Sequence, residues 1–487
     1  MNTWSIIVSV VSAVFVLNVG LAAIMVFFER RSPSSTWAWL FVLFFVPVLG
    51  FFVYLIFGRN TGKQKAFGPK ILKDEETLYE FVKDRDELRA EVGKQLFSND
   101  GIHLSKSYRH LLDFATLNLN SGSWMTYHNT MKRFTDGNRK FEALIDDIRS
   151  AKDFIHMEYY IFRGDSLGKT IVEELAKKAA EGVEVRLMYD YMGNITLPKH
   201  FFDKLRDAGG KVSAFIPAFF IRLNYRNHRK IAVIDGKIGY VGGFNIGNEY
   251  LGKVKRFGYW RDTHARFEGE VVDQLQIRFM MDWNFCSEDK FFVTDFYYPK
   301  KDIKNYLPAQ IVSSGPDTKW RNVRNSYFKM INEAEKSIYI ETPYFSPDDG
   351  IQEALKVAAL SGIDVRVIIP ANPDHFFVYW ASMSYLGELL EAGVRCYQYE
   401  NGFIHSKTVF VDGIVGTIGT ANMDIRSFGL NFEVNSFIFD EEQVSLLERD
   451  FMNDLSQCTE ITYEAYLKRG KLFKFRESVA RLISPML

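Results

Sequence analysis

Cysteine is scarce in this sequence. Only three occur among 487 residues, at Cys286, Cys396 and Cys458, and no two of them have the C-x-x-C spacing. Three cysteines are too few for a disulfide framework, so the stability of the fold must come from packing. This usage predicts three small buried side chains and fits a reducing compartment.

Charge of one sign is not in excess either. The 60 Lys and Arg residues balance 60 Asp and Glu residues, which gives a formal net charge of +0 at pH 7. No overall field would draw nucleic acid or an anionic membrane to the protein, so any attraction must come from local patches. We therefore expect no nucleic-acid partner. The length and the 47% hydrophobic content indicate two or three domains with a large core.

Long apolar runs, by contrast, are present at the N-terminus. Residues 4–28 and 37–57 carry no charged side chain, and each run reaches the roughly 20 apolar residues that cross a bilayer. The first run lacks a preceding basic segment and is longer than the apolar part of a signal peptide. We predict a transmembrane hairpin over residues 1–58. A packed helix pair tolerates the interruptions of these runs, which are Asn18, Pro47 and Gly50.

Basic residues set the expected orientation of this hairpin. The link between the runs carries Arg30 and Arg31, and a larger cluster follows the second run, at Arg59, Lys63, Lys65, Lys70 and Lys73. Because basic clusters beside membrane spans stay in the cytoplasm, we expect both termini there, on a multi-pass protein of the cell membrane. Residues 59–135 are predicted to form a charged connector that contains a solvated helix.

The rest of the chain contains an internal repeat of about 180 residues. Residues 151–158 read A-K-D-F-I-H-M-E and residues 334–341 read A-E-K-S-I-Y-I-E. A helical stretch that ends at glycine and then a β-rich run follow in both copies, and this order predicts βαβ units. The predicted fold is therefore α/β, with a duplicated domain pair, mostly parallel sheets and a pseudo-two-fold axis. Its halves are predicted to cover residues 136–300 and 301–460.

Each half contains the same motif. Residues 228–235 read H-R-K-I-A-V-I-D, and residues 405–412 read H-S-K-T-V-F-V-D. Both continue into the pattern H-x-K-x4-D-x6-G-x-x-N, whose five fixed positions are too many to recur by chance. In a strand, residues two apart point to one face, so each His and Lys project into one site. The motif segments are residues 222–249 and 399–426.

These residue types suit the chemistry of a phosphodiester. Lysines offer positive charge to the non-bridging oxygens, and asparagine amides donate hydrogen bonds. One neutral histidine attacks phosphorus, while a second, protonated histidine gives its proton to the leaving alcohol. The predicted catalytic residues are His228, Lys230, Asp235, His405, Lys407 and Asp412, with Asn245 and Asn422 as phosphate-binding residues.

A catalytic histidine also needs a partner that fixes its orientation. Asp262 and Glu433 are the candidates for this role. Asp235 and Asp412 stand at predicted strand ends, which leaves a structural role open for both. A lysine beside each histidine would repel a cation, so we expect no metal and no other cofactor.

The two motifs resemble the HKD motifs of the phospholipase D superfamily. With two spans ahead of two such halves, nearly the whole chain resembles the bacterial cardiolipin synthase family; G-G-F-N-I-G-N-E-Y and Y-W-R-D-T-H are specific parts of the match. The resemblance implies two phospholipase D-like α/β domains and membrane lipids as partners. It further implies that a phosphatidyl group passes from one phosphatidylglycerol to another, giving cardiolipin and glycerol. His228 would carry it as a phosphohistidine, with His405 as acid and base.

The residues alone leave other functions open. A lipid hydrolase that makes phosphatidic acid would use the same groups, whereas neutral charge disfavours a membrane-tethered nuclease and two intact motifs disfavour a non-catalytic scaffold. The near-symmetry of the halves also leaves the roles of the two histidines exchangeable, and the donor lipid and oligomeric state stay open. Two segments are candidates for lipid contact: residues 215–226, with Phe215, Phe219, Phe220, Ile221, Arg222 and Arg226, and the basic amphipathic tail, residues 461–487.

Overall fold

The computed structural model describes residues 3–28, 33–54, 61–81, 114, 116–215 and 225–484. By their internal contacts these residues fall into two compact units. One contains the N-terminal helices as far as residue 72, together with Tyr225. The other is the α/β body, which begins at residue 73 and holds both motifs. The helix α4 (Thr61–Phe81) runs from the first unit into the second.

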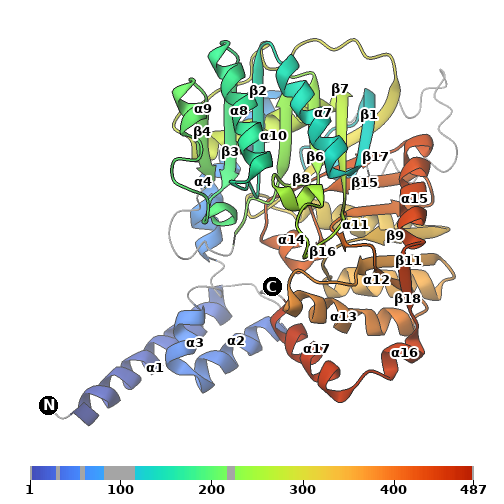
Figure 1. Cartoon of the computed structure of the whole chain (residues 1–487). Coiled ribbons are helices and arrows are strands. Elements are labelled where there is room, and N and C mark those ends of the chain that lie inside the picture. The colour runs from blue at the N-terminus through green and yellow to red at the C-terminus, as the bar shows by residue number, and fades with distance from the viewer. Residues whose placement is uncertain are drawn as a thin grey trace. The chain divides into compact units, whose positions relative to one another are not determined.

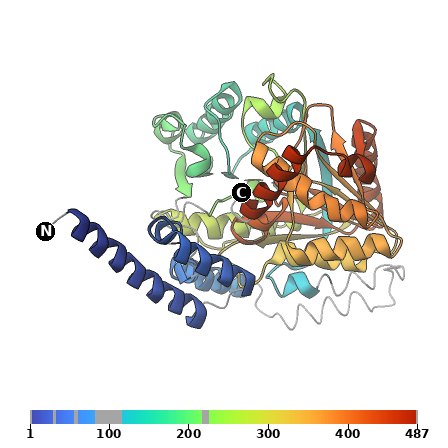
Figure 2. The ribbon, with the colours of Figure 1, turned by 90° about the horizontal axis from the view of Figure 1, so that it is seen from below.

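The N-terminal apolar runs form three helices rather than two. The first run is the continuous helix α1 (Thr3–Phe28) (Figures 1 and 2). Among the described residues it is the one helix that is long and apolar enough to cross a membrane. The second run is divided into α2 (Pro33–Phe45) and α3 (Pro47–Val53), because Pro47 has no N–H to continue the helix. Its predicted end, residues 55–57, lies outside the described residues.

Asn18 explains how this break is accommodated. Proline at position 47 leaves the carbonyl of Leu43 without its helical donor, and the buried Asn18 Nδ2 donates to Leu43 O at 3.0 Å. The same amide donates to Pro47 O at 2.9 Å. Asn18 therefore links α1 to both α2 and α3, as a polar residue does within a packed helix pair.

The body contains one sheet of sixteen strands and a short pair, β10 (Phe345–Ser346) with β16 (Met423–Asp424). The strands of the first half are β1 (Thr126–Asp136), β2 (Phe154–Tyr159), β3 (Glu184–Asp190), β4 (Lys211–Phe215), β5 (Lys230–Ile234), β6 (Ile238–Gly242) and β7 (Trp260–Gly269). Those of the second half are β8 (Tyr306–Ser314), β9 (Ser337–Glu341), β11 (Asp364–Pro370), β12 (Arg395–Tyr399), β13 (Phe403–Ile404), β14 (Thr408–Val411), β15 (Val415–Gly419), β17 (Glu433–Ile438) and β18 (Cys458–Ile461).

The predicted duplication is visible in the strand order. From the first half inwards the order is β4-β3-β2-β5-β6-β7-β1, and from the second half inwards it is β12-β11-β9-β14-β15-β17-β8. The two halves join where β1 pairs with β8 in antiparallel orientation. Because β1 begins at Thr126 and belongs to this sheet, the first half starts earlier than the predicted boundary after residue 135.

The expectation of mostly parallel sheets is wrong. Within the sheet, parallel pairing is confined to the outer strands β2, β3 and β4, the outer strands β9, β11 and β12, and the pair of β13 with β7. Each motif strand turns back through Asp-Gly into an antiparallel hairpin, β5 with β6 and β14 with β15. The sheet is therefore mixed, since both motifs contain the turn sequence that reverses the chain.

Helices cover both faces of this sheet (Figures 1 and 2). In the first half they are α7 (Gly137–Ser150), α8 (Ser166–Ala180), α9 (Asp203–Asp207) and α10 (Val271–Cys286), with short 3₁₀ turns at Met192–Asn194 and Asn248–Leu251. In the second half they are α11 (Asn322–Glu333), α12 (Asp349–Leu360), α13 (Phe376–Glu391), α14 (Ile425–Gly429), α15 (Glu441–Leu455), α16 (Tyr463–Leu467) and α17 (Lys471–Ile483). Most of the strands are accordingly buried on both sides, with cores in each half.

Candidate active site

The two motif histidines lie where the halves exchange backbone hydrogen bonds. His228 N–H donates to Phe432 O at 3.0 Å, and His405 N–H donates to Arg261 O at 2.6 Å. The strand β13, which leads into His405, also pairs with β7 of the first half. Each motif is thus fixed to the chain segment of the opposite half, and this brings both histidines to one place.

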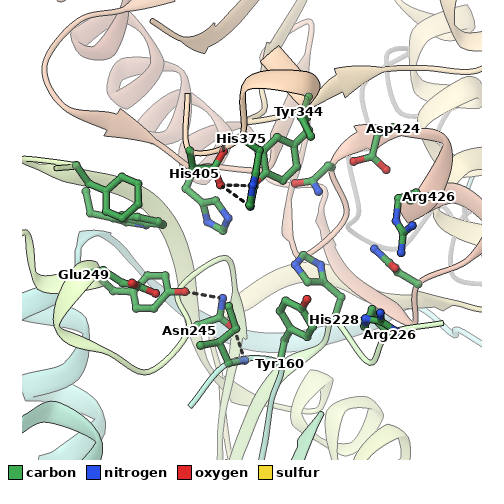
Figure 3. A pocket seen from close by; sticks show the side chains of 18 of the residues that line it. Tyr160, Arg226, His228, Asn245, Glu249, Tyr344, His375, His405, Asp424 and Arg426 are labelled. Atoms are coloured by element: carbon green, nitrogen blue, oxygen red, sulfur yellow. Dashed lines mark hydrogen bonds and ion pairs between the residues drawn. The ribbon is translucent and has the colours of Figure 1, made fainter. Parts of the chain in front are cut away.

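A carboxylate from the opposite half holds each histidine. Nδ1 of His228 lies 3.0 Å from Glu433 Oε2, and Nδ1 of His405 lies 2.6 Å from Asp262 Oδ2. Both carboxylates are fully buried. With Nδ1 engaged, Nε2 is the ring nitrogen left for a substrate, and both rings line one cavity (Figure 3). The structure therefore brings together four residues that the sequence predicted for the site.

The motif lysines lie behind the histidines. Lys230 Nζ donates to His228 O at 2.6 Å, and Lys407 Nζ lies 2.5 Å from His405 O and 2.9 Å from its Nδ1. Burial lowers the pKa of Lys230 to about 7 and that of Lys407 to about 8, against the attraction of nearby carboxylates. Neither lysine is among the residues that line the cavity, so their charge acts on it from one layer below.

The motif asparagines do line the cavity. Asn245 is held on both sides: its Oδ1 accepts from Ile161 N–H at 3.0 Å, and its Nδ2 donates to Tyr250 Oη at 3.1 Å. Asn422 differs, because no donor among the described residues reaches its buried Oδ1. An orphan acceptor of this kind is costly unless a ligand satisfies it.

Asp235 and Asp412 are not brought to the cavity, so their inclusion in the catalytic set is corrected. The Asp235 carboxylate accepts the backbone N–H groups of residues 152, 153 and 154 at 2.8–3.2 Å. Asp412 accepts those of residues 335, 336 and 337 at 2.7–2.8 Å. Both have positive φ angles, 52° and 57°. Each aspartate closes its motif hairpin and anchors the start of β2 or β9. This is the structural role that the sequence left open for both residues.

The cavity has a volume of about 650 Å³. It is lined by Tyr160, Ile161, Arg163, Arg226, His228, Asn245, Glu249, Tyr250, Arg256, Phe257, Trp260, Tyr344, Ser346, Asp374, His375, Val378, Ala381, His405, Asn422, Asp424, Arg426 and Asn431. Cationic and aromatic side chains predominate, which suits an anionic headgroup. In the part of the chain that the structure describes, no group of three His, Cys, Asp or Glu residues could hold a metal ion.

Burial controls the protonation of the histidines. It lowers the pKa of His228 to about 4, although Glu433 opposes this effect, and it lowers the pKa of His405 to about 4, with the charge of Lys407 adding to the effect and Asp262 opposing it. Both rings are therefore neutral at pH 7 while the cavity is empty. A bound phosphodiester brings a negative charge that favours their protonated forms.

The motifs alone did not indicate several cavity residues. Tyr160 and Tyr344 follow β2 and β9, and the ring of Tyr160 lies 4.9 Å from that of His228. Both tyrosines come just after the repeated strand, which is the signal that could have found them. Asp374 and His375 precede α13, and they have no counterpart in the repeated motif pattern. One predicted lipid-contact residue, Phe215, is instead buried in the core against Phe432.

Comparison with known proteins finds the same organisation in two halves. A family model described as "Cardiolipin synthase, PLD-like domain" matches residues 144–283 and 327–455, one segment in each half. A second model, "Phospholipase_D-nuclease N-terminal", matches residues 16–59. Among solved structures, the phosphatidylserine synthase of Haemophilus influenzae Rd KW20 has a TM-score of 0.60 at 15% identity. It covers 79% of this chain and 100% of its own, so the fold is shared.

Curated relatives match nearly from end to end. The cardiolipin synthase of Listeria monocytogenes serotype 4a (strain HCC23) is 49% identical over 478 residues, which cover 97% of this chain and 98% of the relative. That of Staphylococcus aureus (strain Mu50 / ATCC 700699) is 46% identical over 484 residues, with coverage of 98% and 97%. Two matched halves and this identity confirm the resemblance seen in the motifs: the chain belongs to the cardiolipin synthase family of phospholipase D-like proteins.

Proposed function

We propose that this protein transfers a phosphatidyl group from one phosphatidylglycerol to a second one, giving cardiolipin and glycerol. The observation that carries this proposal is the pair of histidines facing one cavity, each held at Nδ1 by a carboxylate of the opposite half. Two such dyads supply a nucleophile and an acid–base group to one phosphorus atom. The names of the curated relatives support the lipid substrate.

In the proposed first step, Nε2 of His228 bonds to phosphorus and the bond to the glycerol oxygen breaks. His405, protonated once the anionic substrate is bound, gives its proton to that oxygen and glycerol leaves. Glu433 stabilises the positive charge that develops on the His228 ring. The positive charges of Lys230 and Lys407 favour the added negative charge on the phosphoryl oxygens.

In the proposed second step, a hydroxyl of the acceptor lipid attacks the phosphohistidine. His405, now neutral, takes the hydroxyl proton, while the bond from phosphorus to His228 breaks and cardiolipin is released. Transfer rather than hydrolysis requires that water is kept from the intermediate. The apolar and aromatic part of the cavity wall, which includes Phe257, Trp260 and Val378, supports such exclusion.

The experiment is to incubate the purified full-length enzyme with labelled phosphatidylglycerol in a chelating buffer. Cardiolipin and glycerol in equal amounts support the proposal, whereas phosphatidic acid would identify a hydrolase and no turnover would contradict both. His228→Ala should also abolish the labelled covalent adduct, whereas His405→Ala should slow both its formation and its breakdown without abolishing it. An adduct on another residue in the His228 variant would overturn the assignment of the nucleophile.

We further propose that the N-terminal helices form a two-span anchor, with the body in the cytoplasm. The apolar helix α1 and its packing through Asn18 against α2 and α3 support a hairpin. The basic residues that follow the second run support the orientation. A single cysteine introduced in the link, residues 29–32, should react with a membrane-impermeant thiol reagent in intact cells. If the cysteine is labelled only after lysis, either the proposed orientation or the proposed second span is wrong.

The C-terminal helix α17 is the proposed second contact with lipid. Glu477 and Ala480 are buried, whereas an apolar row is exposed: Leu472, Phe473, Phe475, Val479 and Leu482. Basic residues alternate with this row, at Lys471, Lys474, Arg476 and Arg481. An exposed apolar face with cationic edges is typical of helices that lie on anionic membranes. Residues 216–224, the other candidate for lipid contact, lie outside the described residues.

A further inference from the structure

The two sides of the cavity differ just outside the repeated motifs. Two positions before the motif histidine, the first half has Arg226 and the second half has Phe403. Four positions after the motif asparagine, the first half has Glu249 and the second half has Arg426. At both positions, the difference between the halves puts an arginine on the His228 side of the cavity. The duplicated pattern itself does not account for this pair of cations.

Backbone contacts bring the two arginines together from opposite halves. Arg226 O accepts the N–H of Phe432 at 2.8 Å, and Arg426 O accepts the N–H of Asn431 at 2.9 Å. Consecutive residues of one segment therefore anchor both. Both side chains line the cavity, and Figure 3 shows them on the same side of His228, with Glu249 on the other side.

The arginines repel each other across this part of the cavity. Burial lowers the pKa of Arg426, and the charge of Arg226 adds to that effect against the opposing charge of Asp424. Two guanidinium groups held close together are relieved by an anion that accepts hydrogen bonds from both. Phosphate oxygens have the number and geometry of acceptors that such a pair requires.

A polar atom beside the pair also needs a ligand. Asn431 lines the cavity and is 8% exposed, and its Nδ2 donates to Glu433 Oε1 at 3.2 Å. That contact turns Oδ1 away from Glu433, and among the described residues no donor reaches it. The equivalent position in the first half is Trp260, so this acceptor too is confined to the His228 side. A hydroxyl group is the donor that would satisfy it.

The proposed reaction requires more than one phosphate site. The phosphodiester of the donor lies between the histidines, where it uses the motif lysines and asparagines. The acceptor phosphatidylglycerol has a phosphodiester of its own, joined through three carbons to the hydroxyl that reacts. We infer that Arg226 and Arg426 form a second phosphate subsite, which binds the phosphodiester of the acceptor while Asn431 accepts a hydrogen bond from its other glycerol hydroxyl. This inference rests on the proposed function.

The subsite positions the acceptor and takes no part in the bond changes. The acceptor oxygen bonds to phosphorus, the bond from phosphorus to His228 Nε2 breaks, and the electron pair returns to the ring. His405 takes the hydroxyl proton. The arginines fix the far end of the acceptor, which raises the fraction of bound acceptor molecules whose hydroxyl is in line with phosphorus.

A competition between two soluble acceptors tests the subsite. The enzyme receives phosphatidylglycerol as donor and equal amounts of glycerol and glycerol 3-phosphate, each with a different isotope label. The labelled products are phosphatidylglycerol and phosphatidylglycerol phosphate, and both form from one phosphatidyl-enzyme. Their ratio is therefore independent of the donor step and of the fraction of enzyme that is folded.

We expect wild-type enzyme to prefer glycerol 3-phosphate, and Arg226→Gln or Arg426→Gln to reduce that preference about tenfold. Arg426→Lys should keep part of it, since lysine retains the charge but not the two-pronged geometry. Asn431→Leu should affect both acceptors alike. The matched control is Arg206→Gln, which removes an exposed arginine paired with Asp203 and should keep the wild-type ratio.

An unchanged ratio in both glutamine variants would overturn the subsite, as would a wild-type enzyme that shows no preference. If a glutamine variant makes no product, the lysine variant of the same residue supplies the ratio. A wild-type enzyme that forms neither labelled product contradicts the proposed transfer reaction itself. That result is distinct from product formation without preference, which contradicts the subsite alone.

Discussion

Glu433 and Asp262 each hold a histidine that belongs to the other half of the chain. The pKa of each carboxyl lies below its ordinary value although burial alone would raise it, because the contact with its histidine and the charge of the neighbouring motif lysine favour the carboxylate. The charged carboxylate fixes the tautomer in which Nδ1 carries the proton and Nε2 faces the substrate. Replacing the carboxylate by the amide of the same shape therefore removes both its charge and its control over the orientation of the histidine ring.

Glu433→Gln and Asp262→Asn should each lower kcat about 100-fold or more, with a smaller effect on KM. The measurement is steady-state cardiolipin formation at saturating phosphatidylglycerol. Glu460→Gln, which removes an exposed partner of Arg395, is the control and should match wild type. A loss smaller than threefold in both carboxylate variants would show that the histidines do not depend on them.

The second prediction at this scale concerns pH. In the free enzyme the pKa values of both histidines are lowered to about 4, and that of Lys230 to about 7. A bound phosphodiester raises all of them, because its negative charge favours the protonated forms. As pH rises, these three groups therefore lose their protons at lower pH in the free enzyme than in the complex with substrate. kcat/KM should fall at lower pH than kcat. If kcat/KM and kcat fall at the same pH, substrate binding does not raise these pKa values and the prediction is contradicted.

Most single residues of the site were predictable because the motif occurs twice in the chain. The spacing identified His228, His405 and both asparagines, and the segments after each motif contained Asp262 and Glu433. The spacing did not reveal that the carboxylates cross between halves, since that depends on the pairing of β13 with β7 and of Asn227 with Phe432. It also placed the motif lysines in the cavity wall, whereas burial sets them one layer behind it.

At the scale of elements, the motif hairpins depend on Asp235 and Asp412. Asp235→Ala should lower the free energy of unfolding by about 2–3 kcal/mol, because three backbone donors lose a charged acceptor and alanine disfavours positive φ. Asp235→Asn keeps an acceptor and tolerates that φ, so its loss should be about half. Denaturant titration in detergent gives these values. An alanine variant that is stable yet inactive when folded would restore the catalytic interpretation.

The exposed row on α17 gives a second prediction for an element. Phe475 is 66% exposed and Leu482 is 82% exposed, and each apolar side chain of this size contributes about 1.5–3 kcal/mol when it leaves water. The variant Phe473→Ser, Phe475→Ser, Leu482→Ser should raise KM at least about fivefold for phosphatidylglycerol in anionic vesicles. Activity on dispersed short-chain phosphatidylglycerol should remain. Equal KM values on vesicles would contradict a lipid-binding role for α17.

Element types followed well from the sequence, but their directions did not. Helices ending at glycine and apolar strands were expected from the repeat, and the βαβ order holds for the outer strands. Each motif contains an Asp-Gly turn that reverses the chain, so its strand pairs antiparallel with the next strand, and the order of the repeat alone does not predict this direction. The break before Pro47 could not be located from apolar character alone, because hydropathy does not report the missing N–H.

At the scale of the whole molecule, the halves are joined too closely to unfold separately. β1 and β8 continue one sheet across the junction, and Arg229 of the first half donates to Glu433 O at 3.2 Å and Ser314 O at 3.3 Å. We therefore expect the α/β body to unfold in a single cooperative transition. Scanning calorimetry of the detergent-solubilised protein should give equal calorimetric and van't Hoff enthalpies for that transition. Two resolved transitions of similar enthalpy would contradict this expectation.

The exchange of carboxylates between the halves has a consequence for the history of the gene. A single half has a histidine whose own carboxylate points to another histidine, so one copy alone cannot complete a dyad. The ancestral unit, before duplication, could have built this site only as a symmetric homodimer. Fusion of two copies then freed each flank to mutate independently, and the pair Arg226 and Arg426 on one side records that loss of symmetry.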